Sequence, residues 1–223
     1  MVARLLISSA GMLIVMGAIL FGSAGTWSWP GAWAFLIEMA VSSLGLGPGL
    51  ARHDPALLAS RLGSPIEKAQ SPWDRVFMFG ALVSFCAWTA FMGWCWRANH
   101  GTDVPAWLQV AGFILVAACM GLCWLVFRAN SFAAPVVKLQ TGQTVASHGP
   151  YRFVRHPMYA GALLYFLGVP MLLGVWTGLL ATPFLAFGLG ARALGEERVL
   201  RVGLAGYDDY ASRVRYRFVP LVW

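Results

Sequence analysis

Two short polar segments in the second half of the chain hold residue types that can bind and orient a small polar ligand. In the first, HGPYRFVRHPMYAG at 148–161, His156 precedes Pro157, and Tyr159 follows within one helical turn. Proline suits the first turn of a helix and keeps the residue before it out of helical geometry. We therefore expect His156 at a helix entrance, where its ring and the free backbone N–H groups can face a ligand.

The second polar segment is RALGEERVL at 192–200. Arg192 and Glu196 are four residues apart and would meet on one helix face, whereas Glu197 projects about 100° further round the axis. One interpretation is a surface ion pair, worth roughly a few tenths of a kcal/mol. The other is a ligand site, because an acid pair in a chain with only nine acidic residues would attract a cationic group strongly.

Other polar residues have two open interpretations. Arg152 and Arg155 either contact a ligand or anchor lipid phosphates. Tyr151 and Tyr159 could belong to an interfacial aromatic belt. In the C-terminal segment, lipid contact is the favoured interpretation for two further arginines, Arg215 and Arg217.

An acidic residue, Glu38, falls in the middle of an apolar run. Acids inside a membrane are costly and are candidates for function. For Glu38 a packing hydrogen bond and a substrate contact stay equally open.

The composition indicates the class of protein in which these polar residues lie. Of the 223 residues, 59% are hydrophobic and 11% are charged, whereas a soluble domain is about one quarter charged. This is the composition of an integral membrane protein. The net charge of +7 is spread between apolar segments rather than gathered in one patch, which argues against nucleic-acid binding. The four cysteines lie inside apolar runs, and no metal-binding cluster is expected.

Apolar runs of about 20 residues predict membrane-spanning helices. The chain contains enough of them for an all-α, polytopic fold that ends in a helical hairpin turning near 173–176. The six predicted spans are 4–22, 31–50, 74–96, 105–128, 157–174 and 176–195.

The basic residues give the expected orientation of these spans. Six spans place both termini on one side, and that side then holds 15 of the 16 Lys and Arg residues, with only Arg97 opposite. Positive charge marks the cytoplasmic side, so we expect the termini and the polar segments to be cytoplasmic. We divide the chain into four N-terminal spans at 1–128 and a core at 129–223 with two spans and an interfacial C-terminal segment.

Four motifs occur in a recognisable order: V-x-x-Q at 137–140, GPYRFVRHPMY at 149–159, EERVL at 196–200 and YDDYASRV at 207–214. This order resembles the isoprenylcysteine carboxyl methyltransferase family and its relatives, the membrane phospholipid methyltransferases. The resemblance covers about residues 128–217. It implies an enzyme that uses S-adenosylmethionine and releases S-adenosylhomocysteine, with a cofactor pocket at the cytoplasmic ends of the last two spans.

The resemblance also assigns residues. Arg192 matches an arginine on the substrate side, where it could hold an acceptor carboxylate through paired hydrogen bonds; an amine acceptor would instead need a base such as Glu197 or His156. Positions that match cofactor contacts in the family are Gln140, Gln143, Thr144, Val145, Ala146, Tyr151, His156, Pro157, Met158, Tyr159 and Glu196.

A soluble cofactor and a membrane-embedded site together indicate a lipophilic acceptor that arrives from the surrounding lipid. The favoured acceptor is the carboxylate of an isoprenyl-cysteine-like molecule. N-methylation of a phosphatidylethanolamine-type head group is the first alternative. A transporter or scaffold of the same fold without catalysis, and a sterol reductase using a nicotinamide cofactor, are the others.

Overall fold

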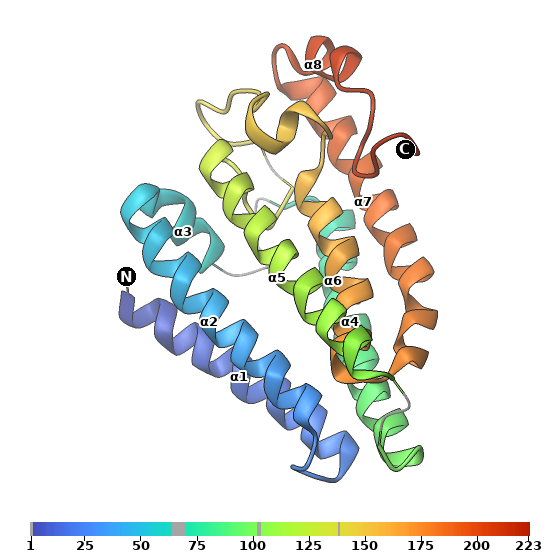
Figure 1. The fold of residues 1–223 in the computed structure, drawn as a ribbon. Helices are drawn as coiled ribbons and strands as arrows, with labels where there is room; N and C mark the ends of the chain where they lie inside the picture. The colour runs from blue at the N-terminus through green and yellow to red at the C-terminus, as the bar shows by residue number, and fades with distance from the viewer. Residues whose placement is uncertain (1, 64–69, 102–103, 138) are drawn as a thin grey trace.

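The computed structural model of the protein describes residues 2–63, 70–101, 104–137 and 139–223. These residues form helices and connecting loops (Figure 1), which confirms the all-α prediction. The α-helices are α1 (Val2–Ala24), α2 (Pro30–His53), α3 (Pro55–Arg61), α4 (Pro72–Ala98), α5 (Ala106–Ala129), α6 (Pro157–Leu173), α7 (Thr182–Gly203) and α8 (Tyr207–Arg213), and two 3₁₀ helices are η1 (Gly149–Arg152) and η2 (Trp176–Ala181).

The long helices match the predicted membrane spans. Among the described residues, α1, α2, α4, α5 and the joined η2–α7 segment are long and apolar enough to cross a membrane. The α6 helix is equally apolar but has 17 residues. The protein is thus a multi-pass membrane protein.

The last predicted span differs from the structure in its ends. It begins as the 3₁₀ helix η2, and α7 continues to Gly203, well beyond the predicted end at 195. The polar segment 192–200 therefore lies on the same helix as the apolar residues before it. The hairpin turns where predicted, because Gly174 ends α6 with a left-handed φ of 73°. Pro183 lies in the first turn of α7, where proline fits without distortion.

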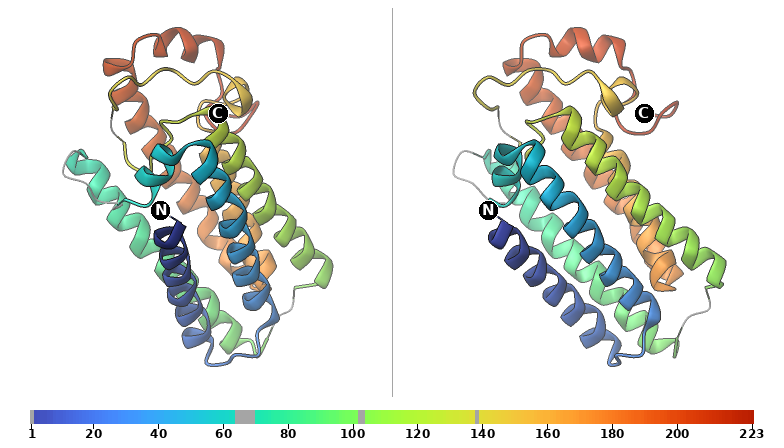
Figure 2. Two further views of the ribbon diagram at one scale, coloured as in Figure 1. Left: turned by 90° about the vertical axis from the view of Figure 1, so that its left-hand side faces the viewer. Right: turned by 60° about the vertical axis from the view of Figure 1, so that its left-hand side comes forward.

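The helices pack as one bundle. The most extensive contact joins α5 to α6, and α1 packs on both α2 and α4. Because α5 and α6 belong to different predicted parts of the chain, the division at 128/129 crosses a tight interface and stays a prediction. Figures 1 and 2 show the N-terminus, α3, α8 and the C-terminus toward the same end of the bundle. The polar segments gather at this end, which the charge pattern predicts to be cytoplasmic.

Two glycines allow the close approach of α5 and α6. A Cβ atom at Gly112 would lie 2.4 Å from the backbone nitrogen of Leu172 and 2.6 Å from the carbonyl oxygen of Gly168. Such contacts with backbone cannot be relieved by a change of rotamer. The two backbones can approach this closely only without a side chain at Gly112.

We predict that Gly112→Val lowers the free energy of unfolding by about 1–3 kcal/mol, the usual cost of overpacking. Thermal unfolding in detergent should show a lower midpoint. Gly121→Ala on the same helix is the matched control, because a Cβ atom there would meet nothing within 4 Å. Equal midpoints for the two variants would contradict a tight α5–α6 contact.

Candidate functional site

A cavity of about 980 Å³, its open mouth included, lies at this end of the bundle. Its walls are the loops 130–137 and 143–146, η1, the start of α6, the last turns of α7, and α8. Of the residues predicted to contact a cofactor or acceptor, all line this cavity except Gln140 and Glu197.

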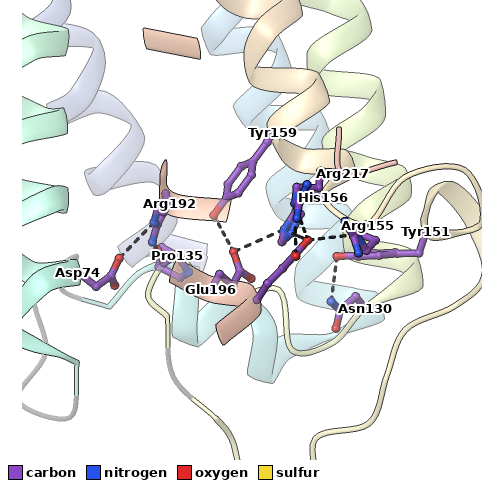
Figure 3. Close-up of polar contacts among 11 residues, drawn as sticks. Asp74, Asn130, Pro135, Tyr151, Arg155, His156, Tyr159, Arg192, Glu196 and Arg217 are labelled. Atoms are coloured by element: carbon purple, nitrogen blue, oxygen red, sulfur yellow. Dashed lines mark hydrogen bonds and ion pairs between the residues drawn. The ribbon is translucent and has the colours of Figure 1, made fainter. Parts of the chain in front are cut away.

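The predicted helix entrance at His156 is confirmed, with the ring facing α7. His156 precedes α6 with φ −124° and ψ 67°, and Pro157 begins the helix. The His156 and Tyr159 rings stack with their centroids 5.2 Å apart. Tyr159 Oη donates a 2.7 Å hydrogen bond to Glu196 Oε2, as Figure 3 shows. The Glu196 side chain is 30% exposed and lines the cavity, so its carboxylate is open to a ligand.

Glu197 lies outside the cavity, in a buried ion cluster. Its side chain is 4% exposed, and its Oε1 lies 3.1 Å from Arg155 Nε and 3.1 Å from His156 Nε2. Arg217 Nε donates to Oε2 at 3.3 Å. Because a carboxylate only accepts hydrogen bonds, the proton of His156 belongs on Nε2. With these partners Glu197 is placed to orient the cavity wall, and its role as a base for an amine acceptor stays a prediction.

The C-terminal segment supports the same wall. The backbone N–H groups of Arg155 and His156 donate to the carbonyl oxygens of Tyr216 and Arg217, at 2.9 and 2.7 Å. The Arg217 guanidinium lies 4.6 Å from the centroid of the Trp223 ring. Arg217 was expected to contact lipid, and the structure adds an ion pair with Glu197 that the sequence did not indicate. Only the fold could show this, because no sequence spacing links Arg217 to Glu197.

Tyr151 and the two tyrosines of α8 form the opposite wall. Asn130 Nδ2 donates to Tyr151 Oη, and Tyr210 Oη donates to the Tyr151 carbonyl oxygen, both at 2.9 Å. Burial raises the pKa of Tyr151 to about 12, so its hydroxyl stays protonated. Gly206, with a φ of 79°, joins α7 to α8 and turns Tyr207 toward the cavity. Tyr207 is 4% exposed, and its hydroxyl has no hydrogen-bond partner among the described residues.

Gln140 acts on the cavity indirectly. Its side chain donates to the Phe132 carbonyl oxygen at 3.0 Å, and its backbone N–H donates to Gln143 Oε1 at 3.0 Å. These bonds connect the loop 130–137 with the loop 143–146. Gln140 thus braces the two loops that line the cavity, and its predicted direct contact with a cofactor stays untested.

Arg192 has a partner that sequence spacing did not indicate. It pairs with Asp74 of α4 rather than with Glu196: Arg192 Nε lies 3.2 Å from Asp74 Oδ1, and Nη2 donates to the Pro135 carbonyl oxygen at 2.6 Å. Asp74 is fully buried. A lone aspartate in the first turn of an apolar helix was the available signal, but acids are common in that position.

Glu38 is buried in α2, where it is 5% exposed. Neither of its carboxyl oxygens has a hydrogen-bond partner among the described residues. The packing hydrogen bond considered from the sequence is therefore not formed in the described part of the chain. Glu38 does not line the cavity.

Comparison with known proteins identifies a related family and a related fold. Residues 107–203 match the family model described as phospholipid methyltransferase. This match and the structural similarity below confirm the resemblance predicted from the sequence. The chain carries the core of an integral membrane methyltransferase. No curated protein sequence matches.

A solved membrane methyltransferase has a similar fold. It is described as the eukaryotic intramembrane Ras methyltransferase, isoprenylcysteine carboxyl methyltransferase, determined without a monobody. The TM-score is 0.57 at 19% sequence identity, and the alignment covers 96% of this chain and 75% of the other. Similarity at this identity is similarity of fold, and it extends beyond the matched methyltransferase core to the N-terminal helices.

We predict that Glu197→Gln lowers the free energy of unfolding by about 3 kcal/mol, because two arginines would lose their buried counter-charge. For a chain of this size, that corresponds to a fall of roughly 6–12 °C in the unfolding midpoint. Thermal unfolding in detergent measures it. Arg215→Ala, at an exposed position on the same tail, should leave the midpoint unchanged. A wild-type midpoint for Glu197→Gln would refute the structural role of the cluster.

Proposed function

We propose that this membrane methyltransferase uses S-adenosylmethionine to methylate the carboxylate of a lipophilic, isoprenyl-cysteine-like acceptor at the cytoplasmic face of the membrane. One observation carries the proposal. One cavity opens at the polar end of the bundle, and it is lined by polar and aromatic side chains suited to the cofactor. Arg192 of α7 lines the same cavity and lies closer to the membrane interior.

The cavity residues fit the chemical groups of the cofactor. S-adenosylmethionine carries an ammonium, a carboxylate, a sulfonium and an adenosine ring. The Glu196 carboxylate would attract the ammonium, and the buried Arg155, which also lines the cavity, would attract the carboxylate. Tyrosine faces suit the sulfonium and the ring. The Tyr207 hydroxyl, buried without a partner, is the kind of group that a bound ligand satisfies.

Arg192 is placed to receive the acceptor. On α7 it lies one helical turn before Glu196, which puts it about 6 Å closer to the membrane interior. Its Nε and one N–H of Nη2 are held by Asp74 and Pro135. The rest of the guanidinium can bind a carboxylate, and the planar group favours a paired geometry.

The reaction needs orientation more than acid–base catalysis. When bound, the cofactor supplies an activated methyl group, which an ionised carboxylate can attack directly. Arg192 would align the acceptor, while Glu196, Tyr159 and the α8 tyrosines would fix the donor side and exclude water. No residue then has to remove a proton, in keeping with the buried and paired state of Glu197.

Phospholipid N-methylation is the second candidate, and the match of residues 107–203 to the phospholipid methyltransferase family favours it. An amine acceptor must lose a proton in the course of methylation. Glu196 would be the available base, since it is the partly exposed acid of the cavity. The paired state of Glu197 makes the carboxylate acceptor our first choice.

Titration calorimetry of the purified protein should show binding of S-adenosylhomocysteine. We predict that Glu196→Ala abolishes this binding because it removes the anionic partner of the ammonium. Tyr207→Phe should weaken it about three- to tenfold, as expected for one lost hydrogen bond. The same Tyr207→Phe variant should unfold at or above the wild-type temperature, since the hydroxyl has no partner within the described protein. No binding by the unchanged protein at high micromolar ligand would refute the proposed function.

The acceptor class can be read from the product. Protein supplied with methyl-labelled cofactor and membrane lipid should give a product whose label is released by mild alkali, because a methyl ester hydrolyses and an N-methyl amine does not. We predict that Arg192→Ala keeps S-adenosylhomocysteine binding and loses transfer. Label that resists alkali would indicate an amine acceptor. Full turnover by Arg192→Ala would contradict the proposed role of Arg192 in binding the acceptor carboxylate.

A further inference from the structure

We infer that Asp74 is a positioning residue of the methyl-transfer site, which acts on the acceptor through Arg192. This inference rests on the proposed function and extends it to α4, a helix outside the segment that matches the methyltransferase family. Asp74 does not line the cavity. Its effect must therefore pass through the groups that it holds.

Asp74 accepts hydrogen bonds from three directions. Oδ2 receives the Gln70 side chain at 2.6 Å and the backbone N–H of Val137 at 3.0 Å. Oδ1 receives Arg192 Nε at 3.2 Å. The side chain is 0% exposed. A buried carboxylate with this many charge-assisted and neutral donors has one favourable orientation, so it fixes its partners in return.

The three bonds set the position of Arg192 relative to the cavity wall. Val137 and Pro135 belong to the loop 130–137, and Arg192 binds Pro135 while Asp74 binds both Arg192 and Val137. The guanidinium also lies over the Phe77 ring, 5.6 Å from its centroid. Arg192 is thus held along one edge and on one face. Figure 3 shows Asp74 on the far side of Arg192 from Glu196.

This arrangement has a consequence for affinity. Without Asp74, Arg192 would keep its charge but lose the contact that holds its Nε edge. The side chain could then adopt several rotamers, and the entropy cost of ordering it would reduce the affinity for the acceptor. A structural residue would be expected to affect the cofactor and the acceptor alike. A residue that acts through Arg192 should affect the acceptor alone.

The test is a double-mutant cycle with N-acetyl-S-farnesyl-cysteine as the acceptor probe. We expect Asp74→Asn to raise the KM for the probe about tenfold or more, as for loss of a hydrogen bond to a charged group. Its affinity for S-adenosylhomocysteine should stay within about threefold of wild type. In an Arg192→Gln background, where transfer is expected to be lost, the cycle is read from the dissociation constant of the probe. Asp74→Asn should weaken this binding little further, because the effects of residues that act through one another are not additive.

The controls separate the possible outcomes. Asp209 is an exposed acid on α8. Asp209→Asn should change neither the KM for the probe nor the affinity for S-adenosylhomocysteine. Asp74→Glu keeps the charge and should recover part of the probe affinity. Additive effects, a wild-type KM in Asp74→Asn, or loss of S-adenosylhomocysteine binding in both Asp74 variants would each overturn the positioning role. Failure of the unchanged protein to bind S-adenosylhomocysteine would instead overturn both proposals.

Discussion

The site depends on the buried charge cluster around Glu197. This carboxylate joins α7 to the entrance of α6 through Arg155 and His156, and to the C-terminal segment through Arg217. These elements are far apart in sequence, and two like-charged arginines would repel one another without the acid between them. The residue next along the helix, Glu196, can face the cavity because Glu197 fixes the rotation of α7. Adjacent acids in one short motif therefore have opposite surroundings.

Local chemistry in the sequence predicted much of the architecture. Apolar run lengths located the helices, and the His-Pro pair at 156–157 located the start of α6. The hairpin turn at Gly174 lies within the predicted 173–176 segment. These features depend on a few neighbouring residues, so a sequence contains them directly. The ends of α7 were less predictable, because its polar last turns are stabilised by contacts with the cavity wall and the tail rather than by their own hydrophobicity.

Partners of charged residues could not be predicted in the same way. Arg217 was expected at lipid and Arg192 beside Glu196, yet both pair with acids from elsewhere in the chain. Such pairs depend on how helices are rotated and which loops cross between them. The residues predicted to line the cavity were identified mostly from the resemblance to a family. Such a resemblance gives positions in the chain but not the partners of each side chain. Asp74 lies outside those motifs, and only the packed bundle brings it to Arg192.

The junction at Gly206 limits changes in chain length. Each residue added to a helix turns everything after it by about 100° and moves it by 1.5 Å. The stretch from Glu197 to Gly206 is anchored at one end by the ion cluster and at the other by the left-handed turn that directs Tyr207 to the cavity. An insertion or deletion there would rotate α8 away from the wall it completes. The spacing between the two motifs is therefore as much a determinant of the site as the residues within them.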